Sequence, residues 1–198
     1  MRKLIFTTAV LFLFSTLHLS SAQEDAPTSF NTAKRQLTFS FGYGEAYPGL
    51  GETETRVRDI DFVLKYGHFL SGEIGSSWYR GRHEILVEVP LYYVVNPKSA
   101  IMVGINFLAC WNFTAVSKTI VPYIFAGGGP LYTNLNLPEM GAKFNGNYQA
   151  GVGTHYFIKR DVAIDFTARY HRISNAGTAD PNVPLNSTKV FVGLSRFW

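Results

Sequence analysis

Beyond residue 36 the chain alternates apolar and polar residues with a period of two, which is typical of strands and not of helices. Between residues 161 and 174, for example, Ile164 and Phe166 fall on one face, whereas Asp165 and Arg169 fall on the other. The pattern predicts eight strands, at roughly 37–44, 56–67, 83–95, 100–111, 120–133, 143–157, 161–174 and 188–198.

These segments have the length of tilted membrane-spanning strands, about 9–11 residues, and an even number of them suits a closed ring. Only 16% of the residues are charged, whereas about a quarter is usual in soluble domains. Aromatic residues reach 15%, with 16 Phe and 11 Tyr. Apolar faces turned toward lipid would explain both values. The sequence therefore predicts an all-β fold, an eight-stranded antiparallel transmembrane β-barrel of the outer membrane.

The polar faces of the predicted strands must then look inward. A barrel of about eight strands is filled by side chains, so a pore is disfavoured and inward charges must pair with one another. Asp59 and Asp61 resemble a pair for acid–base chemistry, but an ion-paired lumen is the favoured interpretation. The predicted inward network is Asp59, Asp61, Lys65, Glu88, Asp165, Arg169 and His171, and within it Asp165 is expected to pair with Arg169.

Connection lengths predict which end of the barrel faces which side. The short segment 157–161 reads as a periplasmic turn, whereas the segments near 45–55, 134–143 and 174–187 are long enough for extracellular loops. The connection near 68–81 is longer than a periplasmic turn usually is, and the sequence offers no account of it.

The two ends of the chain carry export and insertion features. Met1–Lys3 is basic, residues 4–19 are mostly apolar, and Ser20–Ala22 offers a signal-peptidase site before Gln23. The alternative is an uncleaved anchor. At the other end, Phe197–Trp198 resembles the terminal aromatic signal of outer-membrane barrels. The predicted organisation is a signal peptide (1–22), a periplasmic N-terminal tail (23–36) and the barrel (37–198).

Composition excludes several classes of function. The formal charge of +4 falls to +2 once Arg2 and Lys3 are removed, and no basic run forms a patch, so no nucleic-acid partner is predicted. Cys110 is the single cysteine and is expected to pack as a small apolar residue. The zinc-protease motif HExxH and the hydrolase motif GxSxG do not occur. No cofactor or metal is predicted.

One stretch carries a specific resemblance. Residues 169–186 contain Ser-Asn-Ala-Gly at 174–177 followed by Pro181-Asn182, and they resemble the acyloxyacyl hydrolase family, the PagL-type lipid A 3-O-deacylases. Residues 122–132 and 144–153 and the Trp78-Tyr-Arg-Gly stretch with Glu84 are also similar to this family. The resemblance implies an eight-stranded outer-membrane barrel that cleaves an ester-linked acyl chain from lipid A.

The family's His-x-Ser-Asn motif and its later carboxylate imply the site residues. Ser174 matches the nucleophile and Asn175 the oxyanion donor. Arg172 stands at the position of the family's histidine and Asn186 at that of its acidic residue. A guanidinium stays protonated and cannot act as a general base at neutral pH, and an amide cannot stabilise an imidazolium as a carboxylate does.

His171 is the obvious substitute for the base, but it has the wrong parity. In a regular strand Arg172 and Ser174 share the outward face, whereas His171, three residues before the serine, points into the lumen. A bulge at Arg172–Ile173 would turn His171 outward as a displaced base.

The sequence thus predicts a lipid A deacylase-like protein of the outer membrane, exported by its signal peptide, whose partners are lipid A or lipopolysaccharide and the membrane itself. The alternative function is a non-catalytic barrel that binds lipopolysaccharide or supports the envelope. Replacement of the histidine and the carboxylate favours the alternative, whereas retention of Ser-Asn-Ala-Gly opposes it.

Overall fold

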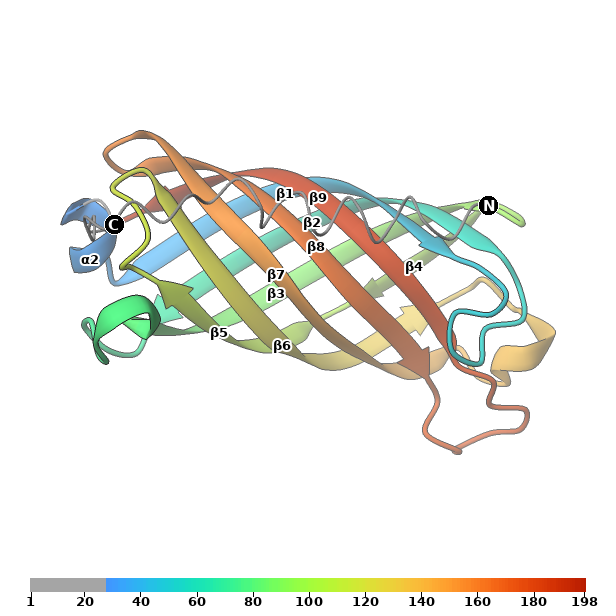
Figure 1. The fold of residues 1–198 in the computed structure, drawn as a ribbon. Coiled ribbons are helices and arrows are strands. Elements are labelled where there is room, and N and C mark those ends of the chain that lie inside the picture. The colour runs from blue at the N-terminus through green and yellow to red at the C-terminus, as the bar shows by residue number, and fades with distance from the viewer. Residues whose placement is uncertain (1–27) are drawn as a thin grey trace, which may run out of the picture.

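The computed structural model describes residues 28–198, and it forms one closed, tilted ring of antiparallel strands (Figure 1). The predicted signal peptide and residues 23–27 of the predicted tail lie outside the described residues. The strands are β1 (Arg35–Ala46), β2 (Val57–Phe69), β3 (Gly81–Asn96), β4 (Ala100–Gly104), β5 (Asn106–Phe113), β6 (Ile120–Thr133), β7 (Phe144–Lys159), β8 (Val162–Ser174) and β9 (Leu185–Phe197). The helical segments are α2 (Thr28–Thr32), η1 (Ser77–Tyr79) and η2 (Pro138–Met140).

The ring has eight strand positions because β4 and β5 together occupy one of them. Only Ile105 separates these two strands, and both pair with β3 on one side and with β6 on the other. Opposite the interruption, a Cβ on Gly129 would lie 2.0 Å from the carbonyl oxygen of Ile105. The glycine therefore permits a backbone approach that a side chain would prevent. Pairing of β1 with β9 and of β2 with β3 closes the ring, as the alternation predicted.

The outer surface of the barrel is apolar along its length. On β1 the outward residues Leu37, Phe39, Phe41 and Tyr43 are between 42% and 57% exposed. The same alternation continues around the ring, so the exposed apolar surface is far larger than the patches of a soluble monomer. Such a surface is stable in a hydrocarbon environment, which a closed ring can enter because it has no unpaired strand edge.

The lumen is packed with paired charges, as predicted, but the pairs differ in part from expectation. Asp165 was expected beside Arg169; instead its Oδ1 lies 2.8 Å from Nζ of Lys65, because Lys65 and Asp165 lie at the same level of the barrel. Arg169 pairs with Glu88, with Nη1 2.9 Å from Oε2. These side chains are almost completely buried. The attraction within each pair therefore offsets the free energy that removing the two charges from water costs.

Lys189 is a lumen charge that the alternation did not single out. Its Nζ lies 2.7 Å from Oδ1 of Asp59 and 2.9 Å from Oδ2 of Asp61, and 3.9 Å from the centre of the Tyr92 ring. The two carboxylates therefore share one cation, which supports their interpretation as an ion-paired part of the lumen.

Cys110 is also buried, beside Leu108, and makes no disulfide.

The N-terminal segment enters the mouth of the barrel at the end opposite to the loops at 47–56, 134–143 and 175–184. Phe30 of α2 is fully buried and contacts Phe69 and Phe197 edge to face, with ring centres 5.3 Å apart in both pairs. Arg82 donates to the backbone carbonyls of Phe30 and Ala33. Part of the segment predicted as a tail is thus a plug, and β1 begins at residue 35 instead of 37.

The three loops predicted to be extracellular share one end of the barrel with the short turn at 97–99, whereas the long connection at 70–80 lies at the other end. The loops at 47–56, 134–143 and 175–184 gather at one end, on the right in Figure 1. The turn at 160–161 and the C-terminus lie at the other end with α2 and η1. The connection at 70–80, whose length the sequence did not explain, contains η1 and the Ile74–Gly81 bridge, so it is an ordered turn.

Candidate active site

Strand β8 carries the predicted site to the rim that bears the long loops. Its pairing with β7 runs without a break from Ala163 to Ser174, and its pairing with β9 from Val162 to Ile173. Burial alternates accordingly, with inward residues buried and outward residues exposed or half-buried. Arg172 and Ser174 therefore face outward together, as the parity of a regular strand predicted.

His171 lies in the lumen, on the opposite face from Ser174. Its side chain is completely buried, with Nε2 3.3 Å from Oδ1 of Asn147 and Nδ1 3.5 Å from Oγ of Ser187. Its ring meets the ring of Tyr92 edge to face, 5.4 Å between centres. The displaced-base alternative required a bulge at residues 172–173, and the continuous pairing contains none. In this structure the His171 imidazole therefore cannot contact the hydroxyl of Ser174.

Arg172 and Asn186 are direct partners across the β8–β9 pairing, so the positions of the family's base and carboxylate do meet. Nη1 of Arg172 lies 3.4 Å from Oδ1 of Asn186, and that oxygen also accepts a hydrogen bond of 2.6 Å from the hydroxyl of Tyr170. Asn186 thus serves as an acceptor for two outward residues of β8.

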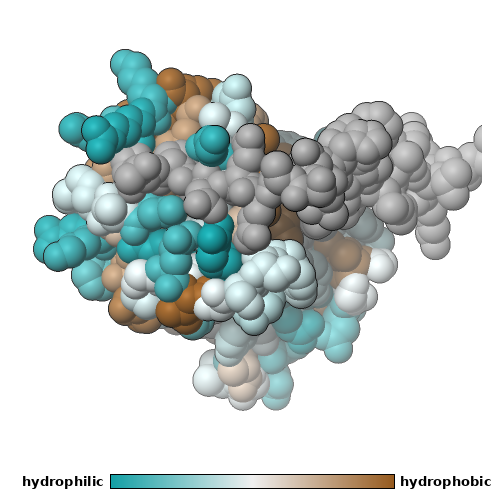
Figure 2. Space-filling model, turned by 60° about the vertical axis from the view of Figure 1, so that its left-hand side comes forward, coloured by the Kyte–Doolittle hydropathy of each residue, from teal (hydrophilic) through white to brown (hydrophobic). Residues whose placement is uncertain are grey.

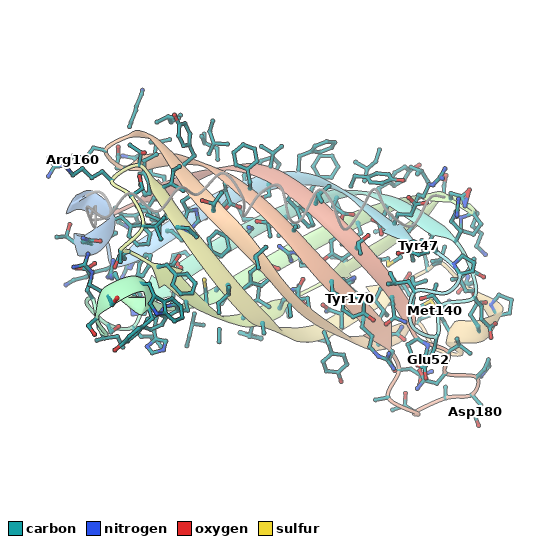
Figure 3. All side chains as sticks on the ribbon, viewed as in Figure 1. Tyr47, Glu52, Met140, Arg160, Tyr170 and Asp180 are labelled. Carbon is teal, nitrogen blue, oxygen red and sulfur yellow. The ribbon has the colours of Figure 1, made fainter. Side chains whose placement is uncertain are left out.

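The loop at 47–56 covers this part of the outer face. The backbone and side-chain amides of Asn186 donate to Oγ1 of Thr53 at 2.8 and 3.2 Å. Beside them Nη2 of Arg172 lies 3.1 Å from Oε2 of Glu52. Asn186 is completely buried although it faces outward, because this loop folds over it. Figure 3 labels Glu52 and Tyr170 toward the end of the barrel that carries the long loops.

Ser174 is held by the loop that follows it. Its hydroxyl donates to Oδ1 of Asn182 at 3.1 Å, and the backbone amide of Ala176 donates to its Oγ at 3.2 Å. The same Asn182 oxygen accepts from the backbone amide of Asn175 at 3.0 Å. Within residues 28–198 neither an imidazole nor a carboxylate is hydrogen-bonded to this hydroxyl, so the serine is ordered but has no base.

Asn175 ties two loops together. Its Nδ2 donates to the carbonyls of Met140 at 2.9 Å and Ala179 at 2.8 Å, and its Oδ1 accepts from the amide of Gly177 at 2.9 Å. The side chain is only 3% exposed. Both amide hydrogens are therefore engaged inside the protein, and a role as oxyanion donor would require this loop to open.

Four residues of the site were not singled out as candidates from the sequence. Glu52 and Thr53 carry no motif, and 120 and 133 residues of chain separate them from their partners Arg172 and Asn186. Tyr170 could have been found, because it shares the outward parity of Arg172. Asn182 was part of the resemblance but had no assigned role.

Among residues 28–198, no group of three or more His, Cys, Asp or Glu side chains is arranged to hold a metal ion. No helix in this range is long and apolar enough to span a membrane.

The fold is a closed barrel of eight strands, with β4 and β5 counted as one. Its apolar exterior and its charged, side-chain-filled lumen give it the architecture of small outer-membrane barrels. Within that class the family can be stated. The family model described as lipid A 3-O-deacylase (PagL) matches residues 64–195, and this chain belongs to that family. The match includes Arg172, Ser174, Asn175 and Asn186 but not the loop at 47–56.

Solved structures agree on the fold. The chain is similar to the outer membrane enzyme PagL, at 16% identity, over 80% of this chain and 97% of that one, with a TM-score of 0.56. It is also similar to Neisserial surface protein A, at 14% identity, over 83% and 97% of the two chains, with a TM-score of 0.61. No curated protein sequence matches the chain.

Proposed function

We propose that this protein resides in the outer membrane and acts on lipid A, with Ser174 as the nucleophile toward an ester-linked acyl chain. The observation that carries the proposal is the convergence of Arg172, Ser174 and Asn186 at one rim. These are the positions that the family resemblance assigns to base, nucleophile and acid. Arg172 and Ser174 face outward beside the apolar belt, where an outer-leaflet lipid would present its acyl esters.

The chemistry of the site limits how fast this reaction can run. Ester cleavage requires the Ser174 hydroxyl to lose its proton as it attacks, and its present acceptor is the amide oxygen of Asn182, which is a poor base. Arg172 cannot take the proton because a guanidinium remains charged. We therefore expect hydrolysis far below that of a site with histidine at position 172.

Binding of lipid A without cleavage is the second candidate, and Arg172 favours it. Its side chain is 38% exposed on the outer face, and its guanidinium holds an exposed carboxylate, that of Glu52, at 3.1 Å. A guanidinium group forms bidentate hydrogen bonds with phosphate oxygens, as it does with carboxylate oxygens. A phosphate group of lipid A can therefore replace Glu52 as the partner of Arg172.

Mass spectrometry of lipid A from cells with and without the protein tests the proposal. Hydrolysis predicts a lipid A species lighter by one ester-linked acyl chain, and Ser174→Ala should remove it. If the wild type leaves lipid A intact but retains it through purification, and Arg172→Ala releases it, the binding function holds. If lipid A is neither changed nor retained, both functions are wrong.

Location is tested separately. The protein should be recovered with the outer-membrane fraction and migrate faster on gels before heating than after, because a closed barrel resists unfolding by detergent. Recovery as a soluble periplasmic protein would contradict the location and with it the substrate.

A further inference from the structure

The periplasmic rim of the barrel carries a cluster of side chains that the proposed function does not use. Lys34, Arg35, His68 and Trp198 line a shallow hollow of about 300 Å³ together with Thr32. The hollow lies at the opposite end of the barrel from Ser174, where the C-terminus and α2 meet (Figure 1). It therefore requires an explanation separate from lipid A.

The register places these residues on, or directly beside, the ends of three adjacent strands, β2, β1 and β9. Arg35 of β1 is opposite His68 of β2, and the backbone of Trp198 lies alongside β1, since its carbonyl accepts from the amides of Lys34 and Arg35 at 2.8 and 3.0 Å. Arg196 of β9 is the outward residue next to Trp198 and lies opposite Leu37. The cluster is thus built by backbone pairing and does not depend on mobile side chains alone.

Each of the three strands continues from the cluster into the lipid-facing surface. Arg35 shares its outward face with Leu37, His68 with Tyr66, and Trp198 with Leu194. Leu37, Tyr66 and Leu194 are 43%, 39% and 56% exposed. A lipid whose headgroup lay at the cluster would therefore lay its acyl chains along an apolar surface that the same strands provide.

The basic side chains of the cluster have no acidic side chain as a partner in the described chain. Among residues 28–198, no Asp or Glu carboxylate lies within ion-pairing distance of Lys34 or Arg35, whereas Arg196 has Asp161 at 3.5 Å. The terminal carboxyl group of Trp198 accepts from the backbone amides of Lys34 and Arg35, so the two cationic side chains still give the hollow an excess of positive charge. At the other end Arg58 pairs with Glu45 and Arg172 with Glu52, both at 3.1 Å. The hollow thus offers two basic side chains to an anion.

Further basic and aromatic side chains surround the hollow at the same end. Lys118 and Lys159 lie exposed at this rim, and Trp78 in the connection at 70–80 is 72% exposed. Figure 2 turns this end forward and shows hydrophilic residues gathered on it beside hydrophobic ones. Exposed tryptophans and cations at the end of an apolar belt are typical of the level of lipid headgroups.

We propose that the hollow formed by Lys34, Arg35, His68 and Trp198 binds the anionic headgroup of a glycerophospholipid in the periplasmic leaflet. The phosphate oxygens lie between Lys34 and Arg35, the ring of Trp198 packs at the headgroup level, and the acyl chains run over Leu37 and Tyr66. The inference depends on the proposed outer-membrane location but not on any action on lipid A. It assigns the protein a second lipid site, on the leaflet opposite to the first.

Native mass spectrometry of the complete mature chain, refolded in a neutral detergent, tests this inference with dioleoyl-phosphatidylglycerol and dioleoyl-phosphatidylcholine as probes. The wild type should retain the phosphatidylglycerol and not the phosphatidylcholine. Lys34→Gln together with Arg35→Gln should weaken retention roughly tenfold or more, because each basic residue near a membrane surface contributes severalfold to the binding of anionic lipid. The backbone bonds to Trp198 remain in this variant.

A matched control removes the same charge from the same rim away from the hollow. Lys118→Gln with Lys159→Gln should reduce retention by less than threefold. An equal loss in both variants, or equal retention of the two lipids by the wild type, would overturn the site. Binding of inorganic phosphate alone with the affinity of the lipid would overturn the lipid as its occupant.

If the double variant does not refold, a salt titration of the wild type replaces it. Retention of phosphatidylglycerol should then fall as sodium chloride rises from about 0.05 to 0.5 M, because the screening length shortens severalfold over that range. Retention independent of salt would contradict an electrostatic site. Lipid A analysis is unaffected by either result, so failure of this inference is distinguishable from failure of the proposed function.

Discussion

Arg172 and Asn186 face each other across strands β8 and β9, with Nη1 of the arginine 3.4 Å from Oδ1 of the asparagine. Backbone pairing thus brings together the two positions at which the resemblance expects a base and a carboxylate. In this chain a permanent cation and a neutral amide occupy them. The proposed hydrolytic site thus lacks groups for proton transfer, and substitutions can test whether its arrangement suffices for hydrolysis once they are supplied.

Replacing Arg172 by histidine should raise ester hydrolysis. The imidazole would stand two residues before Ser174 on the same face, and a positioned base typically contributes about 10²–10⁴-fold. Asn186→Glu in addition should increase the rate further by orienting the imidazole. Fatty acid released from purified lipid A in detergent, followed by mass spectrometry, measures the gain.

The control for this series is Arg172→His with Ser174→Ala, which should return to background. A wild type that already deacylates lipid A, and loses this activity in His171→Ala but not in Arg172→Ala, would mean that β8 rearranges in the membrane. The lumen position of His171 would then not be the functional one.

Glu52→Gln should strengthen the binding of lipid A without changing stability. The pair that it removes is exposed, with the Glu52 side chain 65% accessible, and such pairs contribute about 0–1 kcal/mol. Loss of the carboxylate leaves Arg172 available to phosphate. Binding of lipid A and of its dephosphorylated form, measured by native mass spectrometry, should diverge more in the variant than in the wild type. Glu54→Gln, in the same loop, is the control; equal behaviour of the two variants would contradict competition by Glu52.

Asn175→Ala should loosen the two loops that its amide connects. The change leaves the carbonyl of Met140 without this donor, and a hydrogen-bonding group lost at a buried position costs roughly 1–3 kcal/mol. Hydrogen exchange should accelerate in residues 134–143 and 175–184 and stay unchanged in the strands. Asn134→Ala in the first of these loops should leave residues 175–184 protected. Unchanged exchange combined with lower hydrolysis in the Arg172→His background would instead indicate that the amide contacts substrate.

Asp165→Ala should destabilise the barrel through Lys65. Removing one partner of a buried pair typically costs about 3–5 kcal/mol, because the remaining charge is left in a medium of low polarity. The combination of Asp165→Ala with Lys65→Met should recover part of the loss, but not all, because Tyr123 also donates to Asp165. Urea unfolding followed by tryptophan fluorescence measures both. An identical midpoint for the single and double variants would show that Lys65 is not the relevant partner.

The strands and the faces of their side chains could be predicted from local patterns in the chain. Side chains of a strand alternate strictly, so the outward position of Ser174 and the inward position of His171 followed from their spacing alone. Patterns that are local in the chain also predict the eight strands of the ring, the polar lumen and the end that bears the long loops. The family was accessible for the same reason, because Ser-Asn-Ala-Gly is a continuous motif.

Which residues meet across the barrel could not be predicted in this way, because it depends on the closed ring as a whole. Lys65 and Asp165 are 100 residues apart, and their pairing depends on the stagger of all the strands between them, which no local pattern records. Lys189 became a partner of two carboxylates in the same way. Glu52 and Thr53 fold over Asn186 because their loop forms hydrogen bonds with Arg172 and Asn186. Those partners lie side by side only once β8 and β9 are paired and the ring is closed.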